Sequence, residues 1–258
     1  MKPERLDAVV AEQTGITRSQ ARSLIMEGRV RVNGVPATKA GANVREEARV
    51  EVERPRRFVS RGGEKLDRAL ERFHIAVEGV RALDIGASTG GFTDALLQRG
   101  ASYVVAVDVG YGQIDWKLRN DPRVTVLERT NFRHVAPGAL GEAFSLIVID
   151  TSFISLRTIA ARAVDELTEA GDIVALVKPQ FEAGRERLGA GGVVRDPQVH
   201  RAVLREVRDA MLHIGLPAAG LIESPLLGPA GNREFLLHVR RDAVGLHDAA
   251  IDAIVDDR

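Results

Sequence analysis

Over most of the chain, short apolar runs alternate with stretches whose apolar residues recur at helical spacing. The runs are rich in Val, Ile and Leu and predict strands, whereas the stretches between them predict helices. The predicted strands are Arg81–Ile85, Tyr103–Val107, Val124–Leu127, Leu146–Ile149, Ile173–Val177, Ala218–Ile222 and Phe235–Val239. Predicted helices include Thr93–Gln98, Leu156–Leu167 and Pro197–Ile214. Buried strands that alternate with helices indicate an α/β fold with a doubly wound, mostly parallel seven-stranded sheet.

The first 53 residues follow a different pattern, which predicts a small α+β unit. Leu6, Val9 and Val10 form one helical stripe, and Thr17 with Gln20 is typical of a capping box at the start of a second helix. That helix is expected to stop at Gly28, before strands at Val30–Val32 and Arg49–Glu53 and a turn at Asn33-Gly34.

The run Arg54-Pro55-Arg56-Arg57 lacks any periodicity and predicts a linker. We therefore expect an N-terminal domain at 1–53, a linker at 54–62, a catalytic domain at 63–245 and a C-terminal tail at 246–258. The basic residues are concentrated in the first part of the chain. Residues 1–65 hold 14 Lys and Arg against 9 Asp and Glu, although the whole chain has a formal net charge of zero. This asymmetry fits either a solvated face or a polyanion-binding attachment.

Composition excludes several classes of chemistry. The chain of 258 residues has no Cys, which removes disulfides, zinc–thiolate sites and cysteine nucleophiles. We expect no metal. The chain starts without an apolar signal segment, and its longest apolar stretches fall far short of the roughly 20 residues that a membrane helix needs. A cytoplasmic protein with no membrane contact is therefore expected.

The strongest chemical signal is the glycine-rich segment between the first predicted strand of the sheet and the following helix. Glycines here allow a close approach of backbone to ligand, and a carboxylate about 22 residues further on can accept hydrogen bonds from ribose hydroxyls. The spacing alone fits either a nicotinamide or an adenosyl cofactor. A carboxylate before the loop favours the ammonium group of S-adenosylmethionine over a pyrophosphate. The predicted cofactor residues are Asp84, Gly86, Ala87, Ser88, Thr89, Gly90, Gly91, Phe92 and Asp108.

Five motifs together resemble one known family over nearly the whole chain. They are an S4-like stretch that begins at Arg5-Leu6-Asp7 and runs from Ser19 to Gly34, SRGGEKL at 60–66, DIGASTGGFTD at 84–94, VIDTSFIS at 148–155 and LVKPQFE at 176–182. The chain resembles the TlyA (haemolysin A) family of ribosomal RNA 2′-O-ribose methyltransferases, whose catalytic half is FtsJ-like. The resemblance implies S-adenosylmethionine as cofactor and a cytidine of 16S rRNA, 23S rRNA or both as target, in ribosomal subunits. It leaves the oligomeric state open.

The resemblance also implies roles for individual residues. A catalytic set maps onto Lys65, Asp150, Lys178 and Glu234, with Lys178 as the base for the ribose hydroxyl. Independently of the resemblance, Asp150 and Lys178 end predicted strands, at the sheet edge where open α/β folds bind ligands. Asn131 and Phe132 lie where such enzymes contact adenine. Candidate phosphate contacts in the N-terminal module are Arg5, Arg18, Arg22, Arg29 and Lys39.

Three other functions would fit part of these features. A pseudouridine synthase with an S4 module would leave the glycine-rich loop unexplained, and a pore-forming cytolysin would need a membrane-active segment. A non-catalytic RNA-binding factor would not need a competent adenosyl pocket.

Overall fold

The computed structural model describes residues 3–45, 47–53 and 57–257, and the chain divides into two compact units, Met1–Arg56 and Arg57–Arg258. Residues 54–56 of the predicted linker lie outside the described residues. The remainder of that predicted linker, 57–62, belongs to the second unit and includes the start of its first helix.

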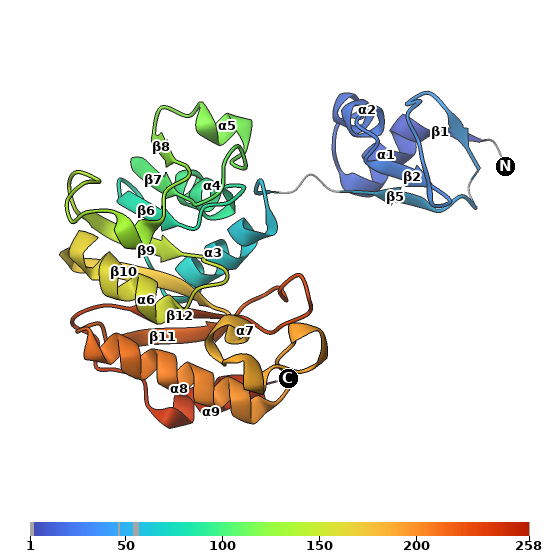
Figure 1. The fold of residues 1–258 in the computed structure, drawn as a ribbon. Coiled ribbons are helices and arrows are strands. Elements are labelled where there is room, and N and C mark those ends of the chain that lie inside the picture. The colour runs from blue at the N-terminus through green and yellow to red at the C-terminus, as the bar shows by residue number, and fades with distance from the viewer. Residues whose placement is uncertain (1–2, 46, 54–56, 258) are drawn as a thin grey trace. The chain divides into compact units, whose positions relative to one another are not determined.

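The N-terminal unit packs two helices against short strands (Figure 1). The predicted capping box is confirmed, because the Gln20 N–H donates to Thr17 Oγ1 and the Thr17 N–H donates to Gln20 Oε1. Asn33 and Gly34 both have positive φ, as the tight turn between two strands requires. The elements are β1 (Glu4–Arg5), α1 (Leu6–Thr14), α2 (Arg18–Met26), β2 (Val30–Val32), β3 (Val35–Pro36), β4 (Asn43–Val44) and β5 (Val50–Val52).

The second unit is built on a seven-stranded sheet in the order β11-β12-β10-β9-β6-β7-β8. Neighbours from β10 to β8 pair in parallel, and β12 pairs antiparallel with both β10 and β11. The predicted fold class is confirmed. The strands are β6 (Arg81–Ile85), β7 (Tyr103–Val107), β8 (Val124–Leu127), β9 (Phe144–Ile149), β10 (Leu167–Val177), β11 (Ala218–Glu223) and β12 (Phe235–Val239).

Helices cover both faces of this sheet (Figure 1). Successive side chains of a strand point to opposite faces, so β6 buries Leu83 and Ile85 in one core and Ala82 in the other. The first core also includes residues of α6, α8 and α9, and the second includes residues of α3, α4 and α5. The helices are α3 (Arg61–Arg72), α4 (Gly91–Gln98), α5 (Trp116–Arg119), α6 (Leu156–Ala163), α7 (Pro179–Glu182), α8 (Pro197–His213) and α9 (Asp248–Asp256), with 3-10 turns at Phe132–His134, Val164–Glu166, Arg185–Arg187 and Ala190–Gly192.

Three elements differ most from the sequence-based expectation. The helix predicted at Leu156–Leu167 ends at Ala163 and is followed by a 3-10 turn at Val164–Glu166. Strand β10 begins at Leu167, six residues before the predicted start, because a register shift between Leu167 and Asp172 lets a polar stretch continue the strand. The predicted C-terminal tail at 246–258 contains helix α9, which buries Ile251 and Val255 against the first core. Arg201, Arg205 and Arg208 of α8 form ion pairs with acidic residues of α9, namely Asp248, Asp252 and Asp256.

The burial of α9 generates a stability prediction. Ile251→Ala should lower the free energy of unfolding by about 2–5 kcal/mol, because a fully buried side chain is replaced by a cavity. Val244→Ala, at a side chain that is 99% exposed, is the control and should change that free energy by less than about 0.5 kcal/mol. Urea denaturation measures both, and equal stability of the two variants would show that α9 contributes nothing to the core.

Candidate functional site

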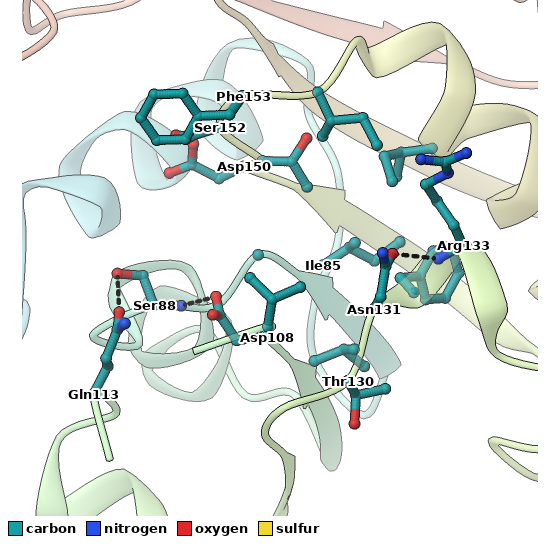
Figure 2. A pocket seen from close by; sticks show the side chains of 17 residues that line it. Ile85, Ser88, Asp108, Gln113, Thr130, Asn131, Arg133, Asp150, Ser152 and Phe153 are labelled. Atoms are coloured by element: carbon teal, nitrogen blue, oxygen red, sulfur yellow. Dashed lines mark hydrogen bonds between the residues drawn. The ribbon is translucent and has the colours of Figure 1, made fainter. Parts of the chain in front are cut away.

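The loop between β6 and α4 lies against the end of β7 and orients a carboxylate there. Ser88 adopts a left-handed φ of 48°, and its N–H donates to Asp108 Oδ2 at 2.8 Å (Figure 2). The Gly110 N–H donates to Asp108 Oδ1 at 2.6 Å. Both carboxylate oxygens are therefore fixed by backbone donors, and each keeps a lone pair for a further donor.

A cavity of about 580 Å³ opens at this edge of the sheet. Figure 2 shows Ser88 and Asp108 on one side of it and Asp150, Ser152 and Phe153 on the other. Its volume lies within the range of small-molecule sites. The predicted cofactor residues that line it are Gly86, Ser88, Asp108, Asn131 and Phe132.

Asp150 connects the cavity to the predicted catalytic set. It follows β9, lines the cavity, and places Oδ1 2.6 Å from Lys178 Nζ at the end of the neighbouring strand β10. Asp150 Oδ1 has no hydrogen-bond partner, so its contact with Lys178 is an ion pair without hydrogen-bond geometry. Lys178 Nζ instead donates to Ser152 Oγ at 2.9 Å. Adjacent parallel strands thus bring a lysine into contact with a carboxylate that lines the cavity.

The other two predicted catalytic residues form a second, more deeply buried pair. Lys65 lies in α3 and Glu234 immediately precedes β12, and the Lys65 ammonium donates to Glu234 Oε2. Their side chains are only 8% and 1% exposed. Sequence alone left both residues open as surface charges, and the structure buries them as partners. The described contacts therefore join the four residues in two ion pairs, Lys178–Asp150 and Lys65–Glu234.

Several predicted cofactor residues are not part of the cavity lining. Asp84 is fully buried, and Thr93 Oγ1 donates to its Oδ2 at 2.7 Å, whereas its Oδ1 has no hydrogen-bond partner. Burial raises the pKa of the Asp84 carboxyl to about 7, against the opposing effect of the Thr93 hydrogen bond. The cavity lining likewise does not include Ala87, Thr89, Gly90, Gly91 or Phe92.

Gly90 and Gly91 allow close packing within the protein. A Cβ on Gly90 would lie 2.3 Å from Leu118, and one on Gly91 would lie 2.2 Å from Ser60 Oγ. Gly86 lies in the cavity lining, and its backbone leaves no room for a side chain. Its φ is +89°, and a Cβ there would lie 2.6 Å from the carbonyl oxygen of Asp150.

The residues that follow Asp150 are part of the site, although sequence reasoning gave them no role. Phe153 has a left-handed φ of 63°, which is unusual for a bulky residue, and its ring is 91% exposed beside the cavity. Its ring centroid lies 5.0 Å from that of Phe181. The buried Glu182 holds this segment by accepting from Ser155 Oγ and from the Leu156 N–H. The motifs around Asp150 and Lys178 contained these residues, but no spacing rule pointed to their contacts.

In the N-terminal unit, three of the five predicted RNA contacts converge on one residue. Arg5, Arg18 and Arg22 all donate to the buried carboxylate of Asp7. Arg29 pairs with Glu27 instead, with 3.7 Å between Nη1 and Oε2. Lys39 belongs to the segment before Ala40, whose carbonyl accepts from the Asp7 N–H.

Within residues 3–45, 47–53 and 57–257, no helix is long and apolar enough to cross a membrane. The same residues contain no group of three or more His, Cys, Asp or Glu side chains arranged to hold a metal ion.

Sequence profiles of two families match the two units. The FtsJ-like methyltransferase profile matches residues 58–241, and the S4 domain profile matches residues 4–50. The 16S/23S rRNA (cytidine-2′-O)-methyltransferase TlyA of Mycobacterium tuberculosis is 50% identical over 97% of each chain. Hemolysin A of Brachyspira hyodysenteriae is 41% identical over 91% of this chain and 98% of its own.

A solved structure supports the same assignment. A Streptococcus thermophilus protein described as a candidate hemolysin superposes with a TM-score of 0.76 at 42% identity, over 99% of this chain and 95% of its own. The chain therefore belongs to the TlyA family, in which an S4 domain precedes an FtsJ-like methyltransferase domain.

Proposed function

We propose that this enzyme uses S-adenosylmethionine to methylate the ribose 2′-hydroxyl of a cytidine in ribosomal RNA. The observation that carries the proposal is the double role of Asp150, which both lines the cavity and pairs with Lys178. A lysine able to take a proton therefore contacts a residue that lines the proposed methyl-donor pocket. A ribosomal RNA target also assigns the reaction to the cytoplasm.

The residues of the cavity fit an adenosyl cofactor. Asp108 is held by two backbone donors with a lone pair free on each oxygen, which suits the two hydroxyls of a ribose. Asn131 and Phe132 would border the adenine, and Gly86 keeps the backbone free of a side chain at the wall. Asp84 acts indirectly in this proposal, because its carboxylate holds Thr93 of α4 from behind the loop. When bound, S-adenosylmethionine supplies a methyl group already activated by its sulfonium.

The chain itself must position the ribose and remove a proton. In its neutral form, after its own proton has been released to solvent, Lys178 Nζ is the atom proposed to take the 2′-hydroxyl proton, and Asp150 and Ser152 fix its position from two sides. The buried Glu234 would hold the Lys65 ammonium toward the substrate in the same way. Positioning of this kind lowers the barrier mainly by removing the entropy of bringing the reactants together.

The substrate assignment rests on the N-terminal unit and on the relatives. Residues 1–53 are proposed as the RNA-binding domain, with phosphate contacts from their arginines, and 63–245 as the methyltransferase domain. The Mycobacterium tuberculosis relative is named for cytidine methylation of both 16S and 23S rRNA. The test incubates the protein with labelled methyl donor and each purified ribosomal subunit from cells that lack this methyltransferase. Mapping should place the label on a cytidine 2′-oxygen, and label on a base instead would overturn the proposal.

The role of Asp108 predicts a loss of cofactor affinity. Asp108→Ala should weaken S-adenosylmethionine binding by about 1–3 kcal/mol, because it removes charge-assisted hydrogen bonds to the ribose. Titration calorimetry measures the change, and Asp121→Ala serves as a control because that carboxylate bonds Arg123 away from the cavity lining. Unchanged affinity in a folded Asp108→Ala protein would contradict this role.

The role of Lys178 predicts a loss of turnover. Lys178→Met keeps the length of the side chain but cannot take a proton, so the single-turnover rate should fall at least about a hundredfold. Cofactor affinity should change little. Lys117→Met, at a lysine that is 58% exposed on α5, should keep the wild-type rate. A Lys178→Met rate above about half that of wild type would show that another group is the base.

The buried Asp84 predicts a pH-dependent term in stability. Its pKa is raised from 3.8 in the unfolded chain to about 7 in the folded protein, so between these values only the folded state keeps the proton. Its contribution to the free energy of unfolding therefore falls as pH rises from about 4 to 7 and then levels off. Urea denaturation of wild type and Asp84→Asn across this range should give curves whose difference changes with pH. Parallel curves would rule out the raised pKa.

A further inference from the structure

The carboxylate of Asp7 is the centre of a three-arginine cluster, defined here as Arg5, Arg18 and Arg22. Asp7 Oδ1 accepts from Arg5 Nε at 3.1 Å and from Arg18 Nη2 at 2.9 Å. Oδ2 accepts from Arg5 Nη2 at 2.9 Å and from Arg22 Nε at 3.0 Å. These four hydrogen bonds fill the usual acceptor capacity of a carboxylate.

The arginines of the cluster have donors beyond those that Asp7 uses. Asp7 itself is 0% exposed, whereas the side chains of Arg5, Arg18 and Arg22 are 48%, 53% and 54% exposed. Each guanidinium has five N–H donors, and Asp7 takes two from Arg5 and one from each of the others. Most donors of the cluster therefore lie outside the Asp7 contacts.

Stability alone does not account for this arrangement. A contact that only tied α1 to α2 would need one arginine, because each added guanidinium repels the others and gives the cluster a net charge of +2. The hydrogen bond from Arg5, assisted by those from Arg18 and Arg22, holds the pKa of the Asp7 carboxyl well below its usual range. The carboxylate thus stays ionised and holds three half-exposed cations at fixed positions.

We propose that Asp7 is a positioning residue for RNA, which holds the three arginines in the geometry that the phosphodiester backbone of folded RNA requires. The inference deepens the proposed function and rests on its assignment of the N-terminal unit as the RNA-binding domain. Guanidinium forks match phosphate oxygens in two-point contacts, so their orientation matters as well as their charge. A cluster fixed in advance loses less side-chain entropy when RNA binds.

The first test separates position from charge. Asp7→Asn raises the net charge by one, so diffuse electrostatics alone would strengthen RNA binding. The proposal expects the opposite, a loss of about tenfold or more in affinity for ribosomal subunits that lack the modification. The apparent KM for the subunit should rise with kcat and cofactor affinity nearly unchanged. Glu12→Gln makes the same charge change at an exposed position of α1 and should bind at least as well as wild type.

A second variant keeps the test decisive if Asp7→Asn unfolds the N-terminal unit. Arg5→Lys leaves the net charge and Asp7 in place but replaces the two-point guanidinium contact by a single ammonium. The proposal expects subunit affinity to fall about threefold to tenfold. Wild-type affinity in Arg5→Lys would overturn the proposal, and so would wild-type affinity in a folded Asp7→Asn protein.

A third variant distinguishes failure of this inference from failure of the proposed function. Replacing Arg18 and Arg22 together by Gln should weaken subunit binding and reduce the dependence of affinity on salt by about two ion equivalents. If the double variant binds weakly while Asp7→Asn and Arg5→Lys bind as wild type, the RNA-binding domain stands and the positioning role of Asp7 falls. If the double variant itself binds as wild type, both the domain assignment and the positioning role are wrong.

Discussion

The backbone of Gly86 packs against the carbonyl of Asp150, and this close contact brings the two sides of the candidate site together. Gly86 follows β6 and opens the glycine-rich loop, while Asp150 follows β9 and begins the segment that contacts Lys178. A Cβ at Gly86 would come within 2.6 Å of the Asp150 oxygen, so only glycine allows the strands to end this close together. The loop that orients Asp108 and the ion pair of Lys178 can therefore border one cavity.

The ion pair between Lys65 and Glu234 also joins two segments that are distant in the chain. Lys65 and Glu234 are 169 residues apart in the chain, yet they meet in a site where both side chains are almost fully buried. Burial of two charges carries a desolvation penalty of several kcal/mol for each ion, and attraction between them recovers it only with good geometry. Apolar residues in the same places would serve stability equally well. The pair is better explained by the chemistry proposed for this edge of the sheet than by a need to hold the fold together.

Much of the fold follows from short-range signals in the sequence. The alternation of β-branched runs with helices predicted every strand of the large sheet, and Thr17 with Gln20 predicted the start of α2, because these patterns depend on neighbours in the chain. Helix α9 was missed because its stability comes from α8 and the core, which lie far away in sequence.

The sequence predicted which kinds of residue form the candidate site, but only part of how they are arranged in space. Strand ends placed Asp150 and Lys178 at one edge, as the topology of a parallel sheet requires. The same glycine-rich segment also serves packing, and only three-dimensional contacts show that Gly86 borders the cavity while Gly90 and Gly91 fit against Leu118 and Ser60. Burial likewise could not be predicted from neighbours in the sequence, so nothing local indicated that Asp84 is fully buried and outside the cavity lining. The role of Asp7 was missed because two of its three partners, Arg18 and Arg22, lie in a different helix.

The two units share one structural feature. In each, a carboxylate holds basic side chains that the proposed function directs toward RNA: Asp7 holds arginines in the first unit, and Asp150 and Glu234 each hold a lysine in the second. An unpaired lysine or arginine samples many rotamers, and ordering it on contact with substrate consumes free energy of binding. A carboxylate that is already paired with the cation removes part of that ordering from the binding step. Each carboxylate also neutralises one positive charge, so its contribution to substrate binding lies in the fixed position of the basic side chain. In-line transfer of a methyl group to one ribose oxygen requires such fixed positions.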